Sequence, residues 1–195
     1  MRTRHLSLAC CALVVAQSLV DADVKSLRKV RDKDVFYFTK ESQKNSRETF
    51  FCGADLNNLY QATETNAHQK NFLWSDGSRL VDYKSKHGDR LQASLFLPAN
   101  YVEGKSYPTI VYIYEKLSQR LHRYDAPRIG GFSMSLYTSR GYAVLMPDII
   151  YRINKPGESA VDCVLPALDA AIKTGVVDPQ HVGLHGHSWG GYQTA

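Results

Sequence analysis

The sequence lacks a long hydrophobic run, a visible internal repeat and a set of residues at metal-ligand spacing. Its main apolar stretch, residues 6–15, is shorter than the ~20 residues that a membrane-spanning helix needs. His185-Gly186-His187 places two histidines close together, but no third ligand group accompanies them. We therefore expect no stable membrane span and no metal or other cofactor.

The N-terminus has the pattern of a secretory signal. Arg2 and Arg4 precede the apolar residues 6–15, and Val20-Asp21-Ala22 offers small residues at the two positions that a signal peptidase reads. The pattern predicts a signal peptide over residues 1–22 and a secreted, periplasmic or cell-surface protein. An uncleaved N-terminal anchor is the alternative.

The composition, 44% hydrophobic and 22% charged, is that of a globular protein and excludes a disordered or collagen-like chain. The formal charge of +5 is spread along the chain. The densest basic run, residues 25–33, alternates with apolar residues and lacks a nucleic-acid-binding motif, so we expect a solvated face and no nucleic-acid partner. Past the signal sequence only Cys52 and Cys163 remain, and we interpret them as separate buried thiols, with a disulfide as the alternative.

Residues 35–74 have the character of short β-strands. Residues 35–39, 48–52 and 58–62 are rich in β-formers or alternate in polarity, and polar segments with Asn, Ser, Gly and Asp separate them. This part of the chain is predicted to be a run of short antiparallel strands.

From about residue 76 the pattern changes to that of an α/β domain. A hairpin comes first, and nearly continuous apolar strands then alternate with helical segments, which indicates a doubly wound sheet entered through antiparallel strands. Pro166 is expected to kink the second helix. The predicted strands are residues 80–84, 91–97, 109–114, 142–146 and 181–186, and the predicted helices are residues 132–140 and 161–172.

The pentapeptide Gly186-His187-Ser188-Trp189-Gly190 carries the strongest chemical signal. It follows an apolar strand and precedes a segment that can begin a helix, which is the context of the nucleophile elbow of α/β-hydrolases. Glycine two residues before and after Ser188 removes the Cβ atoms that would collide in so sharp a turn. Ser188 is therefore the predicted nucleophile, and the alternative is a glycine-rich turn with a structural serine.

No histidine of the sequence fits the role of general base. His185 and His187 lie in the strand and the turn and are expected to point away from the hydroxyl of Ser188. In α/β-hydrolases the acid and the histidine follow the serine in the chain. The other candidates, all of which precede the serine, are His68, His87, His122 and His181.

The segment Gly186-His187-Ser188-Trp189-Gly190-Gly191-Tyr192 closely resembles the nucleophile motif of the prolyl oligopeptidase family. The resemblance extends over residues 177–184, 141–148 and 156–159, and spans about residues 76–195. It implies a serine peptidase that hydrolyses peptide bonds of oligopeptides through an acyl-enzyme on Ser188. A peptide substrate is the implied partner, and the oligomeric state stays open.

The same resemblance implies an oxyanion site. Family members use a tyrosine after the third core strand and the amide that follows the serine, and the matching groups are the Tyr114 hydroxyl and the Trp189 amide. The Trp189 side chain is expected to line the pocket for the residue before the cleaved bond. An ordinary strand-end aromatic is the alternative for Tyr114, and Asp148 and Glu158 are expected to be structural.

The family places a β-propeller before its hydrolase domain, and residues 23–75 are interpreted as its last blade, with residues 76–195 as the catalytic domain. The sequence given ends at Ala195, so the triad acid and histidine are expected to lie outside it and the chain to be part of a longer protein. Two other functions stay open: an esterase or other acyl hydrolase, because the same elbow serves esters, and a non-catalytic hydrolase-like binding protein.

Overall fold

The structure is a computed structural model and describes residues 22–55, 58–128 and 130–195. The chain forms two compact units, one of residues 1–71 with 122–124 and one of residues 72–121 with 125–195. Apart from Ala22, the predicted signal peptide lies outside the described residues. Within the described part of the chain, no helix is long and apolar enough to cross a membrane.

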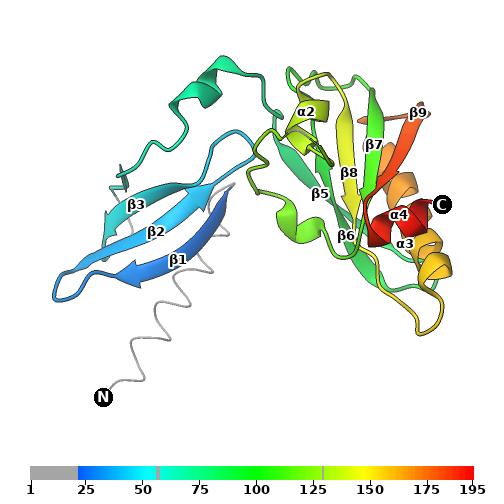
Figure 1. The fold of residues 1–195 in the computed structure, drawn as a ribbon, viewed down its shortest axis with the longest axis horizontal. Helices are drawn as coiled ribbons and strands as arrows, with labels where there is room; N and C mark the ends of the chain where they lie inside the picture. The colour runs from blue at the N-terminus through cyan, green and yellow to red at the C-terminus, as the bar shows by residue number, and fades with distance from the viewer. Residues whose placement is uncertain (1–21, 56–57, 129) are drawn as a thin grey trace. The chain divides into compact units, whose positions relative to one another are not determined.

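The first unit is a four-stranded antiparallel sheet in the order β1-β2-β3-β4 (Figure 1). The three predicted strands are confirmed, although the third is reduced to a short β4, and β1 is a strand that the sequence pattern did not indicate. The short helix η1 follows. The elements are β1 (Asp23–Lys29), β2 (Val35–Glu41), β3 (Glu48–Gly53), β4 (Tyr60–Gln61) and η1 (Ala67–Asn71).

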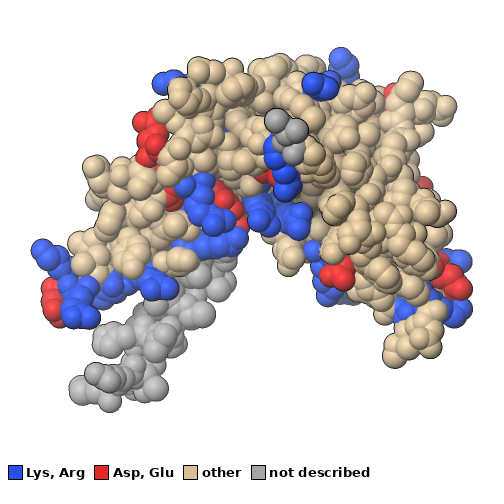
Figure 2. Space-filling model, viewed as in Figure 1, with Lys and Arg blue, Asp and Glu red and all other residues tan. Residues whose placement is uncertain are grey.

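Strand β1 contains much of the basic run, and acidic residues are interleaved with its lysines. Lys25 Nζ lies 2.7 Å from Asp23, and Lys29 Nζ lies 2.8 Å from Asp34 at the start of the next strand. Figure 2 shows acidic atoms among the basic ones at the tip formed by these strands. The basic run thus forms an edge strand and the turn after it, and two of its lysines pair with aspartates.

The second unit is an α/β domain built on a five-stranded sheet in the order β5-β6-β8-β7-β9. Strands β5, β6 and β8 pair antiparallel, while β7 pairs parallel with both β8 and β9. The predicted succession of hairpin, strand, helix, strand, helix and strand is confirmed. The elements are β5 (Ser78–Lys84), β6 (Arg90–Phe96), β7 (Tyr107–Ile113), η2 (Ser118–Arg120), α2 (Met134–Thr138), β8 (Ala143–Pro147), α3 (Pro156–Ile172), β9 (Val177–Gly186) and α4 (Trp189–Thr194).

The sheet is buried on both faces, because alternate residues of its strands enter different clusters. Leu145 packs with residues of α3, whereas Val144 and Met146 pack with Phe132 and Met134 near the start of α2. Helices α3 and α2 therefore cover opposite faces, as a doubly wound sheet requires. This arrangement brings the carboxyl ends of β7, β8 and β9 to one edge.

Helix α3 packs on the sheet mainly through small side chains, although Leu168 and Ile172 also contact the core. Val161 and Leu165 are 53% and 56% exposed, while Ala160, Ala167 and Ala171 are buried. Small side chains let the helix axis approach the sheet closely, so the alanine face forms the contact. The helix α2 is also shorter than predicted.

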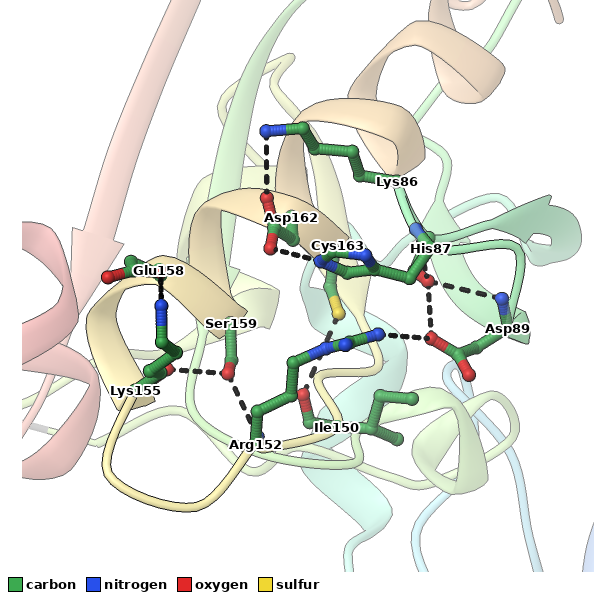
Figure 3. A network of polar contacts seen from close by, with 11 residues as sticks. Lys86, His87, Asp89, Ile150, Arg152, Lys155, Glu158, Ser159, Asp162 and Cys163 are labelled. Atoms are coloured by element: carbon green, nitrogen blue, oxygen red, sulfur yellow. Dashed lines mark hydrogen bonds and ion pairs between the residues drawn. The ribbon is translucent and has the colours of Figure 1, made fainter.

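Pro166 lies within α3, which continues from residue 156 to residue 172. A proline cannot donate to the carbonyl four residues earlier, which here belongs to Asp162. The backbone N–H of Lys86 supplies that hydrogen bond at 2.8 Å from the turn between β5 and β6. The Asp162 carboxylate also accepts a hydrogen bond from His87 Nε2 at 2.8 Å (Figure 3). The turn is therefore bonded to the helix at both the carbonyl and the carboxylate of Asp162.

Cys52 and Cys163 are both free and buried, which confirms the expectation of separate thiols. They lie in different units of the chain. Burial raises the pKa of each thiol, so neither is a ready thiolate nucleophile.

Candidate active site

Ser188 lies at the sharp turn between β9 and α4. Its backbone angles are φ 52° and ψ −116°, and the residue is exposed. This combination is sparsely populated for a residue with a Cβ, and such a conformation costs ~1–3 kcal/mol unless the surroundings impose it. The strand, strained turn and helix that the elbow pattern predicts are therefore present at this serine.

Close packing requires glycine at the two positions that flank Ser188 in the motif. A Cβ on Gly186 would collide with the carbonyl group of Gly190, and a Cβ on Gly190 would collide with the carbonyl oxygen of Ile113. These contacts are made by backbone atoms, which cannot move aside as a flexible side chain can. The turn thus folds tightly only with glycine at both positions.

Tyr114 follows directly after β7, beside the turn. Ile113 pairs with Gly186 in the parallel register, and a Cβ on Gly190 would lie 3.5 Å from the Cα of Tyr114. The ring is half-buried against the cluster on the α2 face of the sheet. No hydrogen bond joins its hydroxyl to any residue that the structure describes, so this phenol has a proton to donate.

Trp189 begins α4, and its backbone N–H is bonded to no acceptor among the described residues, as is usual in the first turn of a helix. Its indole ring is 38% exposed. The ring stacks on Tyr192 with a centroid distance of 5.2 Å and meets the edge of Tyr151 at 6.0 Å. The residue after the serine thus carries both a free amide and an accessible aromatic surface.

Tyr151 connects the two segments that carry these groups. Its hydroxyl donates to the carbonyl oxygen of Tyr114 at 2.6 Å and accepts a hydrogen bond from Gln193 Nε2 at 2.7 Å. Burial raises the pKa of Tyr151, although its interactions with Gln193 and Trp189 act in the opposite direction. The phenol is therefore protonated at neutral pH and can donate.

Asp148 holds the loop that follows Tyr114. Its buried carboxylate accepts the backbone N–H groups of Leu117 and Ser118 at 2.7 and 2.8 Å, and the Ser118 hydroxyl at 2.7 Å. The hydroxyl of Tyr83 also donates to the Asp148 carbonyl oxygen. Asp148 thus holds residues 117 and 118 in place at the edge of the sheet. None of the described contacts joins it to Ser188.

The histidines nearest to Ser188 in sequence do not contact its hydroxyl. The His185 ring packs against Tyr112 and Phe132, with centroid distances of 5.7 and 5.2 Å, and His187 is exposed. Within the described ranges, no side chain forms a hydrogen bond with Ser188 Oγ. The structure brings the turn at Ser188, the start of α4 at Trp189 and the end of β7 at Tyr114 together, and no base among the described residues contacts the serine hydroxyl.

Two other histidines form pairs with aspartates. His87 Nε2 lies 2.8 Å from Asp162, and His181 Nδ1 lies 2.7 Å from Asp178. Each pair has the residue types of the acid and base of a triad, but none of the described contacts joins either pair to Ser188. Among the described residues, no group of three or more His, Cys, Asp or Glu side chains could hold a metal ion.

The sequence pattern indicated Ser188, and the family resemblance indicated Tyr114 and Trp189. Neither indicated Tyr151 or Gln193. The available signal was the position of Tyr151 just past β8, since the carboxyl ends of parallel strands gather functional side chains. Gln193 lies one turn into α4 and carried no such signal.

No protein-family model matches the chain. A probable chloroplastic glutamyl endopeptidase of Oryza sativa subsp. japonica is 29% identical over 134 residues, which cover 60% of this chain and 14% of the relative. The chain therefore spans about a seventh of the length of that curated relative.

Solved structures of peptidases share the fold. The isopeptidase AtxE2 aligns with a TM-score of 0.62 at 16% identity, over 89% of this chain and 28% of that one. The acylaminoacyl peptidase of Pyrococcus horikoshii aligns with a TM-score of 0.61 at 18% identity, over the same shares of the two chains. A prolyl endopeptidase aligns with a TM-score of 0.57 at 14% identity, over 89% and 26%. The resemblance to the prolyl oligopeptidase family is thus confirmed as a likeness of fold to its prolyl endopeptidase and acylaminoacyl peptidase members.

Proposed function

We propose that this chain supplies the nucleophile and the oxyanion site of a serine peptidase that cleaves peptide bonds of oligopeptides. The observation that carries the proposal is the strained backbone of Ser188 at a turn whose glycines pack against the end of β7. Strain of this kind persists only where the surrounding structure imposes it, and it exposes the hydroxyl at the carboxyl edge of the sheet. The peptidase neighbours support the choice of peptide bonds.

In the proposed reaction Ser188 Oγ attacks the carbonyl carbon of the scissile peptide bond and loses its proton to a histidine. The carbonyl oxygen becomes an oxyanion, which the Tyr114 hydroxyl and the Trp189 N–H stabilise by donating hydrogen bonds. The C–N bond then breaks, the amine leaves with the proton from the histidine, and water hydrolyses the acyl-enzyme. The histidine and its acid are proposed to come from residues outside the 195 given.

The test compares Ser188→Ala with the unchanged intact protein on fluorogenic oligopeptides and on p-nitrophenyl esters. We expect peptide cleavage that Ser188→Ala abolishes, because the triad acts as a unit. Ser106→Ala, which alters an exposed serine in the loop before β7, is the matched control and should keep full turnover. Ester cleavage without peptide cleavage would replace peptidase by esterase, and the absence of both would favour a binding protein.

A further inference from the structure

We propose that Tyr151 is a positioning residue that fixes the two oxyanion donors, Tyr114 and Trp189, relative to each other. The inference rests on the proposed function and adds to it a residue outside the elbow, the oxyanion pair and the triad. Tyr151 lies just after β8, whereas the donors follow β7 and β9. It therefore joins two segments that are far apart in the sequence.

The hydroxyl of Tyr151 has one proton, and its partners determine where that proton lies. A carbonyl oxygen accepts only, so the proton must point to Tyr114 O at 2.6 Å. The phenol oxygen then accepts from Gln193 Nε2 at 2.7 Å. One oxygen atom thus ties the backbone of Tyr114 to the helix that begins at Trp189.

The ring of Tyr151 adds a second contact with that helix. It meets the indole of Trp189 edge-on at 6.0 Å, within the distance at which aromatic pairs attract. The hydroxyl contact limits the position of the Tyr114 peptide, and the ring contact limits the orientation of Trp189. Both restraints come from one rigid side chain with only two rotatable bonds.

The backbone just before Tyr151 is itself held against the Tyr114 loop. Ile149 N donates to Glu115 O at 3.0 Å, and the Asp148 carboxylate binds the amides of Leu117 and Ser118. Segments 114–118 and 148–151 therefore contact each other at four successive sites. Tyr151 is the contact nearest to the oxyanion donor.

A restraint of this kind affects catalysis more than substrate binding, because an oxyanion donor misplaced by a fraction of an ångström loses strength mainly in the transition state. In the intact protein Tyr151→Phe should lower kcat ~5- to 50-fold and leave KM within ~2-fold. The ring and the fold are kept, since phenylalanine preserves the contact with Trp189.

The double-mutant cycle with Tyr114→Phe decides the case. If Tyr151 acts through the Tyr114 hydroxyl, Tyr151→Phe should cost less than ~2-fold in kcat once that hydroxyl is absent. The rate of Ser188 labelling by a fluorophosphonate probe should follow the same pattern and does not depend on the substrate. Tyr142→Phe, which alters a surface tyrosine before β8, is the matched control and should change neither rate.

Provided that Ser188 is still labelled, any of three results would overturn the positioning role. They are losses in kcat that simply multiply in the double mutant, an unchanged kcat for Tyr151→Phe, and a rise in KM alone. Ester turnover without peptide turnover would contradict only the choice of peptide bonds. The kcat values of the double-mutant cycle would then be measured with the ester substrate. An intact protein whose Ser188 is never labelled overturns the proposed function and this inference with it.

Discussion

Gly190 packs so closely on Ile113 that a methyl group on residue 190 would collide with the Ile113 carbonyl oxygen. This contact joins the helix after the nucleophile to the end of β7, directly before Tyr114. The first turn of α4 therefore lies directly against the end of β7, and any side chain at residue 190 would force the two apart.

Gly190→Ala should therefore destabilise the protein. Alanine forces α4 away from β7 at a backbone contact, and overpacking of this kind costs ~1–3 kcal/mol in the free energy of unfolding. Denaturant unfolding of the intact protein measures the loss. Gly191→Ala is the matched control, because its added Cβ would meet only the Gly186 carbonyl oxygen, at an ordinary 3.7 Å. Equal stability of the two variants would contradict the packing described.

Tyr114→Phe should lower turnover in the intact protein while KM changes comparatively little. The hydroxyl is expected to donate mainly to the transition state, and removal of one oxyanion donor costs ~10- to 10³-fold in kcat. Tyr112→Phe serves as the control, since Tyr112 lies near the end of β7, two residues before Tyr114, and packs on the same cluster. Unaltered turnover in Tyr114→Phe would make Tyr114 a packing residue.

Asp148→Ala should reduce both stability and turnover. It leaves the N–H groups of Leu117 and Ser118 without their acceptor, and a buried donor left unsatisfied costs ~1–3 kcal/mol. Unfolding by denaturant and steady-state kinetics measure the two effects. Asp82→Ala removes an exposed carboxylate whose one hydrogen bond within the described part of the chain comes from Gln92, and it should change stability by less than ~0.5 kcal/mol. Similar losses in both variants would argue against a specific anchor.

Acid should loosen the tie between α3 and the turn at Lys86. The hydrogen bond from His87 lowers the pKa of Asp162, with Lys86 adding to the effect, so the carboxylate stabilises the contact above the ordinary aspartate range. This stabilisation is lost as the pH falls below ~3.9 and through the lowered pKa. The hydrogen-exchange protection factor of the Lys86 amide, which donates to Asp162 O, should fall in that window.

Asp162→Asn should reduce this protection at neutral pH and abolish the fall in acid. Asp169→Asn, which changes an exposed carboxylate of the same helix, should behave as the unchanged protein does. An identical acid profile in Asp162→Asn would assign the effect to another group.

Much of the second unit could be predicted because each of its strands shows as a pattern within a few consecutive residues. Residues 109–114 form a nearly continuous apolar run of the kind found in strands buried on both faces, and β7 occupies residues 107–113. The turn at Ser188 was predictable for the same reason, since the two glycines and the serine lie within five residues.

The contacts around Tyr151 and Asp148 could not be predicted in this way. They depend on the register that brings segment 148–151 beside segment 114–118, and periodicity along one segment contains no information about its neighbour. The alanine contact of α3 could not be predicted either, because close packing favours the small Ala160 and Ala167, which carry little weight in a hydropathy pattern. Strand β1 was missed because lysines and arginines outnumber its β-formers.

The most direct test of the central claim is the labelling of the intact protein with a fluorophosphonate probe, followed by mass-spectrometric mapping of the modified peptide. We expect a single covalent adduct on Ser188, lost on prior denaturation and in Ser188→Ala, because the hydroxyl is reactive only in the folded site. Labelling that persists in Ser188→Ala, or an adduct on another residue, would contradict the assignment of Ser188 as the nucleophile.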